Sequence, residues 1–158
     1  MTIGASRHRE IACAIIIDMQ GRFLLQQRDD VPGILFPGKV AIFGGHREGD
    51  ETYLQCVVRE IHEELSYFVA PERFEPLVTY NGSDIEAEGG TVHGELFVAR
   101  EIPAERVHVT EGSLLIIERS KLFTLKNKLT PSAQFAIKIW LEKERTLKSR
   151  QAPRDPAY

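Results

Sequence analysis

The sequence predicts an α/β protein of the α+β class, built from several short strands and two amphipathic helices. Apolar, β-branched runs of strand length are separated by turns that contain glycine or proline. The apolar spacing changes to three and four residues at 52–65 and again after Pro131. With 158 residues, 42% of them hydrophobic, we expect a single domain over 1–148 and a polar, proline-containing, disordered tail over 149–158.

The chain opens with an expected β-hairpin, because an almost unbroken apolar run at 11–17 precedes a turn and a second run at 23–25. A short strand at 40–43 follows a loop marked by prolines and glycines. The acidic, glycine-bearing segment 81–90 predicts a mobile loop between two later strands. The later strands are expected at 77–80 and 94–100, with two shorter candidates at 107–109 and 114–117.

The first helix is expected over 52–65, where Asp50 and Glu51 suit the N-terminal end because the helix dipole favours negative charge. Its predicted buried stripe comprises Leu54, Val57, Val58, Ile61 and Leu65. Pro131 and Ser132 precede the second helix, since proline is compatible with a first helical turn. Its predicted stripe comprises Ala133, Ala136, Ile137, Trp140 and Leu141.

Net charge, the length of apolar runs and cysteine content indicate which partners and which cellular location to expect. The chain has 20 basic and 23 acidic residues, a net charge of -3, so we expect neither nucleic acid nor an anionic membrane as a partner. No segment approaches the about 20 apolar residues that span a bilayer, and 1–10 lacks a signal-peptide core. Cys13 and Cys56 lie among apolar residues, which favours reduced core thiols and a cytoplasmic location.

The segment at 45–67 concentrates acidic residues on the first helix. Glu60, Glu63 and Glu64 stand at helical positions i, i+3 and i+4, so their side chains share one face. Mutual repulsion of these carboxylates favours a bound cation. Mg²⁺ is the natural candidate because it prefers hard oxygen ligands, and Ca²⁺ is less favoured because no loop here offers ligands at alternate positions. Arg59 can reach Glu63 or fold back toward Glu51, and either contact would orient a carboxylate. An exposed charged helix face is the competing interpretation.

The same segment resembles the Nudix box, G-x5-E-x7-R-E-U-x-E-E-x-G-U, in which U is an apolar residue. The matching positions are Gly45, Glu51, Arg59, Glu60, Ile61, Glu63 and Glu64. Ser66 stands where the pattern has glycine and Tyr67 where it has an aliphatic residue. We expect serine either to cost about 1 kcal/mol of local strain or to adopt a different helix cap. Both departures are interpreted as structural.

The resemblance implies an α/β/α sandwich with a mixed sheet and a metal-dependent pyrophosphohydrolase that acts on nucleoside diphosphate derivatives. By this resemblance the metal ligands are Glu60, Glu63, Glu64 and the carbonyl of Gly45, while Arg59 and Glu51 orient the cluster. Mg²⁺ is the expected cofactor, and Mn²⁺ can substitute for it.

The general base and the substrate contacts are less defined. Glu111-Gly112 is similar to a Glu-Gly dipeptide that provides a late ligand or base in some family members; an ordinary exposed turn is the alternative. Glu63 or Glu64 could take the proton instead. Arg28 and Arg47 are candidate phosphate contacts, because guanidinium matches phosphate geometry.

Substrate class is not ranked by the sequence. Family markers for oxidised guanine nucleotides, ADP-ribose and coenzyme A are absent, which leaves sugar nucleotides, nucleoside triphosphates and dinucleotides. The alternative is a non-catalytic Nudix-fold module that senses a nucleotide or binds a partner. A small-molecule nucleotide is the expected partner, and exposed strand edges are compatible with a homodimer.

Overall fold

The computed structural model describes residues 7–151 and contains one seven-stranded mixed sheet. The strands are β1 (His8–Asp18), β2 (Phe23–Gln27), β3 (Val40–Ala41), β4 (Phe43–His46), β5 (Phe74–Ser83), β6 (Thr91–Ile102) and β7 (Ser113–Ile117). Their order is β3-β2-β1-β6-β5, with β4 paired to β1 and β7 to β2. Strands β1 and β6 are parallel, and every other pair is antiparallel. The mixed sheet predicted from the resemblance is confirmed.

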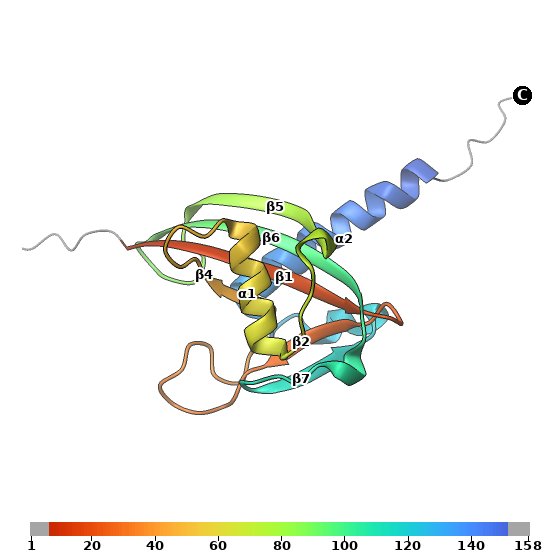
Figure 1. Ribbon diagram of the computed structural model, residues 1–158, viewed down its shortest axis with the longest axis horizontal. Coiled ribbons are helices and arrows are strands. Elements are labelled where there is room, and N and C mark those ends of the chain that lie inside the picture. The colour runs from red at the N-terminus through yellow and green to blue at the C-terminus, as the bar shows by residue number, and fades with distance from the viewer. Residues whose placement is uncertain (1–6, 152–158) are drawn as a thin grey trace, which may run out of the picture.

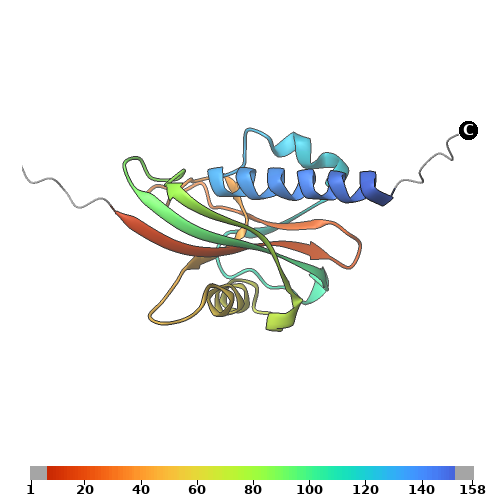
Figure 2. The ribbon, with the colours of Figure 1, turned by 90° about the horizontal axis from the view of Figure 1, so that it is seen from above.

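One long helix covers each face of this sheet (Figures 1 and 2). The helices are α1 (Tyr53–Leu65) and α2 (Pro131–Gln151), with short 3-10 helices η1 (Pro71–Arg73), η2 (Ala104–Arg106) and η3 (Arg119–Leu125). Side chains of β1 alternate between the two cores: Ala12, Ala14 and Ile16 pack with α1, whereas Ile11, Cys13, Ile15 and Ile17 pack with α2. This two-sided burial explains the continuous apolar run in β1.

Helix α1 begins and ends with local signals that position its carboxylates. Thr52 is the N-cap, and its hydroxyl accepts a hydrogen bond from the backbone of Gln55 in a capping box. The expected role of Asp50 and Glu51 at this end is corrected accordingly, because neither lies in the first turn. At the other end Ser66 adopts φ 51°, the left-handed conformation that glycine provides in the motif.

Several sequence boundaries change in the structure. The strand expected at 40–43 divides at Ile42 into β3 and β4, which pair with different neighbours. The candidate strand at 107–109 is wrong, because the backbone N–H of Val107 bonds to Ala104 and that of His108 to Leu65 at the end of α1, instead of to the sheet. In the α1 stripe Leu54 is exposed and Cys56 is buried. The candidate at 114–117 and the apolar stripe of α2 are confirmed.

The C-terminal helix extends further than its sequence suggests. Helix α2 includes 149–151, so the expected tail does not begin at 149; the remainder, 152–158, lies outside the described residues. Lys148 and Arg150 lie in the last turn, where positive charge complements the helix dipole. No helix within 7–151 has the length and apolar character needed to cross a membrane.

The loop between β5 and β6 is tied to the N-terminal strand. Asp84, at the start of the loop, is buried and accepts two hydrogen bonds from Arg9 at 2.5 and 2.8 Å. Its other bond, from the backbone N–H of Glu86 at 2.9 Å, fixes the chain that follows. The segment expected to be a mobile loop is therefore shorter than 81–90, and an ion pair anchors it.

We predict that Asp84→Asn lowers the free energy of unfolding by about 2 kcal/mol at pH 7, because a charged hydrogen-bond pair is lost. Arg9 lowers the pKa of Asp84, so its contribution is present above the unfolded pKa of about 3.9 and is lost as the pH falls through the folded value. In urea unfolding, the difference in unfolding free energy between the wild type and Asp84→Asn should be smaller at pH 3 than at pH 7. Asp50→Asn, an exposed control, should unfold with the wild-type free energy. A difference for Asp84→Asn that is equal at both pH values would contradict the prediction.

Candidate active site

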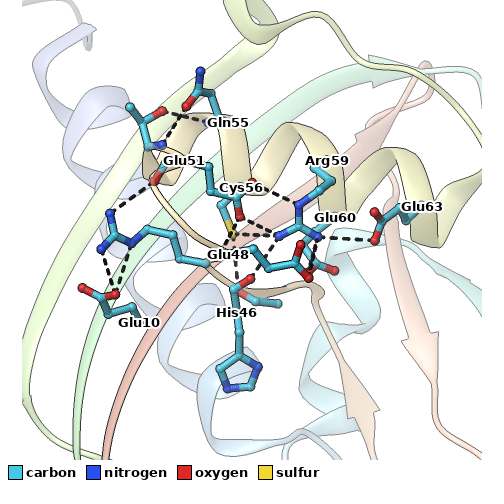
Figure 3. Close-up of polar contacts among 12 residues, drawn as sticks. Glu10, His46, Glu48, Glu51, Gln55, Cys56, Arg59, Glu60 and Glu63 are labelled. Carbon is cyan, nitrogen blue, oxygen red and sulfur yellow. Dashed lines mark hydrogen bonds and ion pairs between the residues drawn. The ribbon is translucent and has the colours of Figure 1, made fainter.

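Arg59 lies at the centre of the carboxylate cluster on α1 (Figure 3). Its guanidinium donates two hydrogen bonds to Glu51, at 2.6 and 3.0 Å, and one to Glu60 at 2.9 Å. It also reaches Glu63 at 3.4 Å and the carbonyl of His46 at 3.1 Å. The two contacts considered from the sequence, back to Glu51 and forward to Glu63, therefore coexist.

These contacts keep the Glu51 carboxylate ionised and hold it in one position. The hydrogen bonds from Arg59 lower the pKa of Glu51 to about 2, and the backbone N–H of Glu48 also donates to its carboxylate. Glu51 in turn raises the pKa of Arg59. Glu51 thus holds Arg59, and Arg59 holds Glu60.

Glu64 points from the end of α1 toward the glycine pair. Its Oε2 accepts a hydrogen bond from the backbone N–H of Gly44 at 2.8 Å. Burial, together with the nearby charges of Glu60, Glu111 and Glu63, raises the pKa of Glu64 to about 8, against the opposing effect of the Gly44 bond. The charges of three further carboxylates therefore act on Glu64, while Arg59 contacts Glu60 and Glu63.

Gly45 lies directly against Glu60. A Cβ atom at position 45 would lie 2.5 Å from the carboxyl carbon of Glu60, so any larger residue would displace the carboxylate. The carbonyl oxygen of Gly45 is 3.7 Å from the sulfur of Cys56. The predicted backbone ligand and the predicted carboxylate ligand are thus neighbours. Burial raises the pKa of Cys56 to about 12, so its thiol stays protonated.

The segment before β7 docks onto the end of α1 and brings Glu111 to the cluster. The backbone N–H of His108 donates to the carbonyl of Leu65 at 2.9 Å, and that of Thr110 donates to the carbonyl of Glu64 at 3.1 Å. These bonds satisfy carbonyls that a helix end leaves unpaired. As a result Glu111 is near enough to raise the pKa of Glu64.

Gln26 is a site residue that the sequence analysis did not identify. This buried side chain on β2 donates from Nε2 to the carbonyl of Glu111 at 3.0 Å. Gly112 has φ 66° and lies so close to Gln27 that a Cβ atom would be 2.3 Å from its carbonyl oxygen. The available signal was a polar Gln-Gln pair ending an apolar strand, which alone points to no function.

A cleft of about 200 Å³ adjoins the carboxylates and is lined by Gly44, Gly45, Glu64 and Arg28, among others. Arg28 also faces a second hollow, of about 410 Å³, together with Glu111. Its Nε donates to the carbonyl of Leu35 at 2.7 Å.

Arg47 lies directly after β4, where its guanidinium donates to the backbone carbonyl of Glu51 at 3.2 Å. Its guanidinium binds Glu10 at 2.9 Å and stacks over Tyr53, 5.2 Å from the ring centre. Arg28 therefore lines the hollows beside the cluster, whereas Arg47 contacts the backbone of Glu51 and forms its ion pair with Glu10.

The donor set has the chemistry of a magnesium site. Carboxylate and carbonyl oxygens are hard ligands, and a cation would relieve the repulsion around Glu64. Within 7–151, no group of three or more Asp, Glu, His or Cys side chains converges as a preformed cage for a metal ion. Two of the expected ligands, Glu60 and Glu63, instead contact Arg59. Magnesium commonly keeps water and substrate phosphate ligands, so a full protein cage is not required.

Comparison with known proteins identifies the family. The NUDIX domain model matches residues 7–126, most of the chain, including every carboxylate described above. The chain belongs to the Nudix family. It is a Nudix-type pyrophosphohydrolase, and enzymes of this family generally use divalent metal ions. No match was found among curated proteins.

Solved structures share the Nudix fold at low sequence identity. The MutT protein of Methanosarcina mazei Go1 is 21% identical with a TM-score of 0.70, covering 93% of this chain and 98% of its own. The ORF135 protein of E. coli is 20% identical with a TM-score of 0.69, covering 97% and 100%. A bifunctional NMN adenylyltransferase/ADP ribose pyrophosphatase of Francisella tularensis, in complex with AMP and a manganese ion, is 21% identical with a TM-score of 0.68, covering 89% and 43%.

Proposed function

We propose that this Nudix hydrolase uses magnesium to cleave the diphosphate linkage of a nucleoside diphosphate derivative: a sugar nucleotide, a nucleoside triphosphate or a dinucleotide. The observation that carries the proposal is the partly buried Glu64, which lines a cleft, accepts a hydrogen bond from Gly44 and lies near the charges of Glu60, Glu63 and Glu111. A reducing compartment such as the cytoplasm suits its two free thiols, Cys13 and Cys56.

In this proposal Glu60, Glu63, Glu64 and the carbonyl of Gly45 hold the metal. Bound magnesium would neutralise the diphosphate and increase the acidity of water. Manganese can replace it, because both ions accept carboxylate oxygen ligands.

Hydrolysis forms a bond from a water oxygen to phosphorus and breaks the bridging phosphorus–oxygen bond, whose electron pair leaves with the second phosphate. Glu111 takes the water proton, since it faces the cluster and its backbone is fixed by Gln26. Arg28, which lines both hollows, contacts the diphosphate.

The proposal is tested by measuring phosphate release from a panel of sugar nucleotides, nucleoside triphosphates and dinucleotides. Each is assayed with magnesium, with manganese and with neither, and is coupled to a phosphatase where the product requires it. Metal-dependent cleavage of one class would support the proposal and name the substrate. Binding of nucleotides without cleavage of any would instead favour a sensor.

We predict that Glu111→Gln lowers kcat at least about tenfold, because the amide cannot accept the water proton. The variant is nearly isosteric, and the contact from Gln26 uses the backbone carbonyl of Glu111, so the fold should be retained. Glu118→Gln, an exposed residue just beyond β7, is the matched control. An unchanged rate would return Glu111 to the interpretation as an exposed turn residue.

A further inference from the structure

The cleft beside the carboxylates has a second polar end. Arg9, Ile11 and Cys13 alternate along β1 and all line the cleft, so they lie on one face of the strand. Cys13 pairs with Gly44, which contacts Glu64, whereas Arg9 adjoins Glu86. Four strand residues span about 13 Å, so the Glu86 end is well separated from the Glu64 end.

Glu86 is fixed at this far end by contacts from three elements. Its Oε1 accepts a hydrogen bond from the backbone N–H of Ser132, at the start of α2, at 3.2 Å. Its Oε2 is 3.6 Å from a nitrogen of Arg9, and its own backbone N–H donates to Asp84. The side chain is only 16% exposed. The carboxylate is therefore oriented before any ligand arrives.

These contacts leave hydrogen-bond acceptor positions on the Glu86 carboxylate unused. An ionised glutamate is an acceptor only, with about four lone-pair positions on its two oxygens. One is used by Ser132, and the nearest nitrogen of Arg9 is beyond ordinary hydrogen-bond distance from Oε2. Glu86 lines the cleft, so acceptor capacity remains for a group inside it.

Apolar side chains form part of the cleft, and Ile11 lies between its two ends on β1. The cleft walls include Ile11, Leu35, Phe36 and Ile42. A flat, mostly apolar ring with polar edge groups matches such walls, and a nucleobase is a group of this kind. With the phosphates at the carboxylate cluster, the sugar would bridge the intervening distance and the base would reach Glu86.

We propose that Glu86 is a specificity-determining residue, which accepts a hydrogen bond from the exocyclic amino group of the substrate's nucleobase. The proposal rests on the proposed function, hydrolysis of a nucleoside diphosphate derivative, and adds that the nucleobase of the substrate carries an amino group. Adenine and cytosine present an amino group where hypoxanthine and uracil present a carbonyl oxygen. A carbonyl oxygen opposite Glu86 places two acceptors together and leaves a buried acceptor unpaired, which a polar site rejects strongly.

The test compares matched nucleotide pairs that share the same leaving group: adenosine with inosine derivatives, and cytidine with uridine derivatives. The wild-type enzyme should show a kcat/KM at least about tenfold higher for the amino-bearing member of a pair. In Glu86→Gln the ratio should fall to near one, because an amide can both donate and accept. Glu88→Gln, exposed in the same loop, should keep the wild-type ratio.

The outcomes separate this proposal from the proposed function. Equal cleavage of both members by the wild-type enzyme, a preference for the carbonyl member, or an unchanged ratio in Glu86→Gln would overturn the role of Glu86 while leaving hydrolysis intact. If no pair is cleaved, calorimetric binding of AMP against IMP gives the same comparison. Tighter binding of AMP, lost in Glu86→Gln, would support base selection without hydrolysis, and equal or absent binding would refute it.

Discussion

Glu64→Gln should lower kcat/KM about a thousandfold, equivalent to about 4 kcal/mol of transition-state stabilisation, because it removes the charge of a proposed metal ligand. The fold should persist or become more stable. Gly44 can still donate to the amide oxygen, and a partly buried carboxylate repelled by Glu60, Glu63 and Glu111 is removed. The measurements are steady-state kinetics across magnesium concentrations and thermal unfolding of the same samples.

A matched control and a clear contradiction accompany this prediction. Glu142→Gln makes the same chemical change on the exposed face of α2 and should leave kcat/KM and the magnesium dependence unchanged. If Glu64→Gln retained wild-type activity, Glu64 would not be a metal ligand. A large loss of thermal stability would instead mean that Glu64 supports the fold through its Gly44 contact.

Arg59→Lys should lower kcat/KM by about 10- to 100-fold and raise the magnesium concentration needed for half-maximal rate. Lysine keeps the charge but cannot contact Glu51 with two nitrogens and Glu60 at the same time. The loss should therefore decrease at high magnesium, because more metal compensates for poorly oriented ligands. Kinetics with and without saturating magnesium measure both effects.

The control for Arg59 is another arginine in an ion pair. Arg22 binds the buried carboxylate of Asp18 at 2.7 Å in the first hairpin, remote in the chain from the carboxylate cluster. Arg22→Lys should affect stability alone. An Arg59→Lys enzyme with unaltered metal dependence would show that the cluster is oriented without the guanidinium.

Local patterns in the sequence were sufficient to predict much of the fold. The apolar run at 11–17 predicted a strand, and its continuous apolar character arises because both faces of β1 are covered. The three- and four-residue spacing of apolar residues predicted both helices. Boundaries were less well predicted. The run at 40–43 has the pattern of one strand, but it divides at Ile42 because β3 and β4 pair with different neighbours. The candidate strand at 107–109 does not join the sheet, because the backbone N–H of His108 bonds to the end of α1.

The sequence by itself determined the family and the set of carboxylates, because Glu60, Glu63 and Glu64 acquire a common face from helical spacing alone. The tertiary structure decided which other residues join them. Glu111 reaches the cluster because its segment contacts the end of α1, and Gln26 on β2 holds its backbone. Arg47 forms an ion pair with Glu10. The partners of these side chains are distant in the chain or come from different elements, and no local pattern encodes such contacts. Their positions follow from the packing of strands, loops and helices around one sheet.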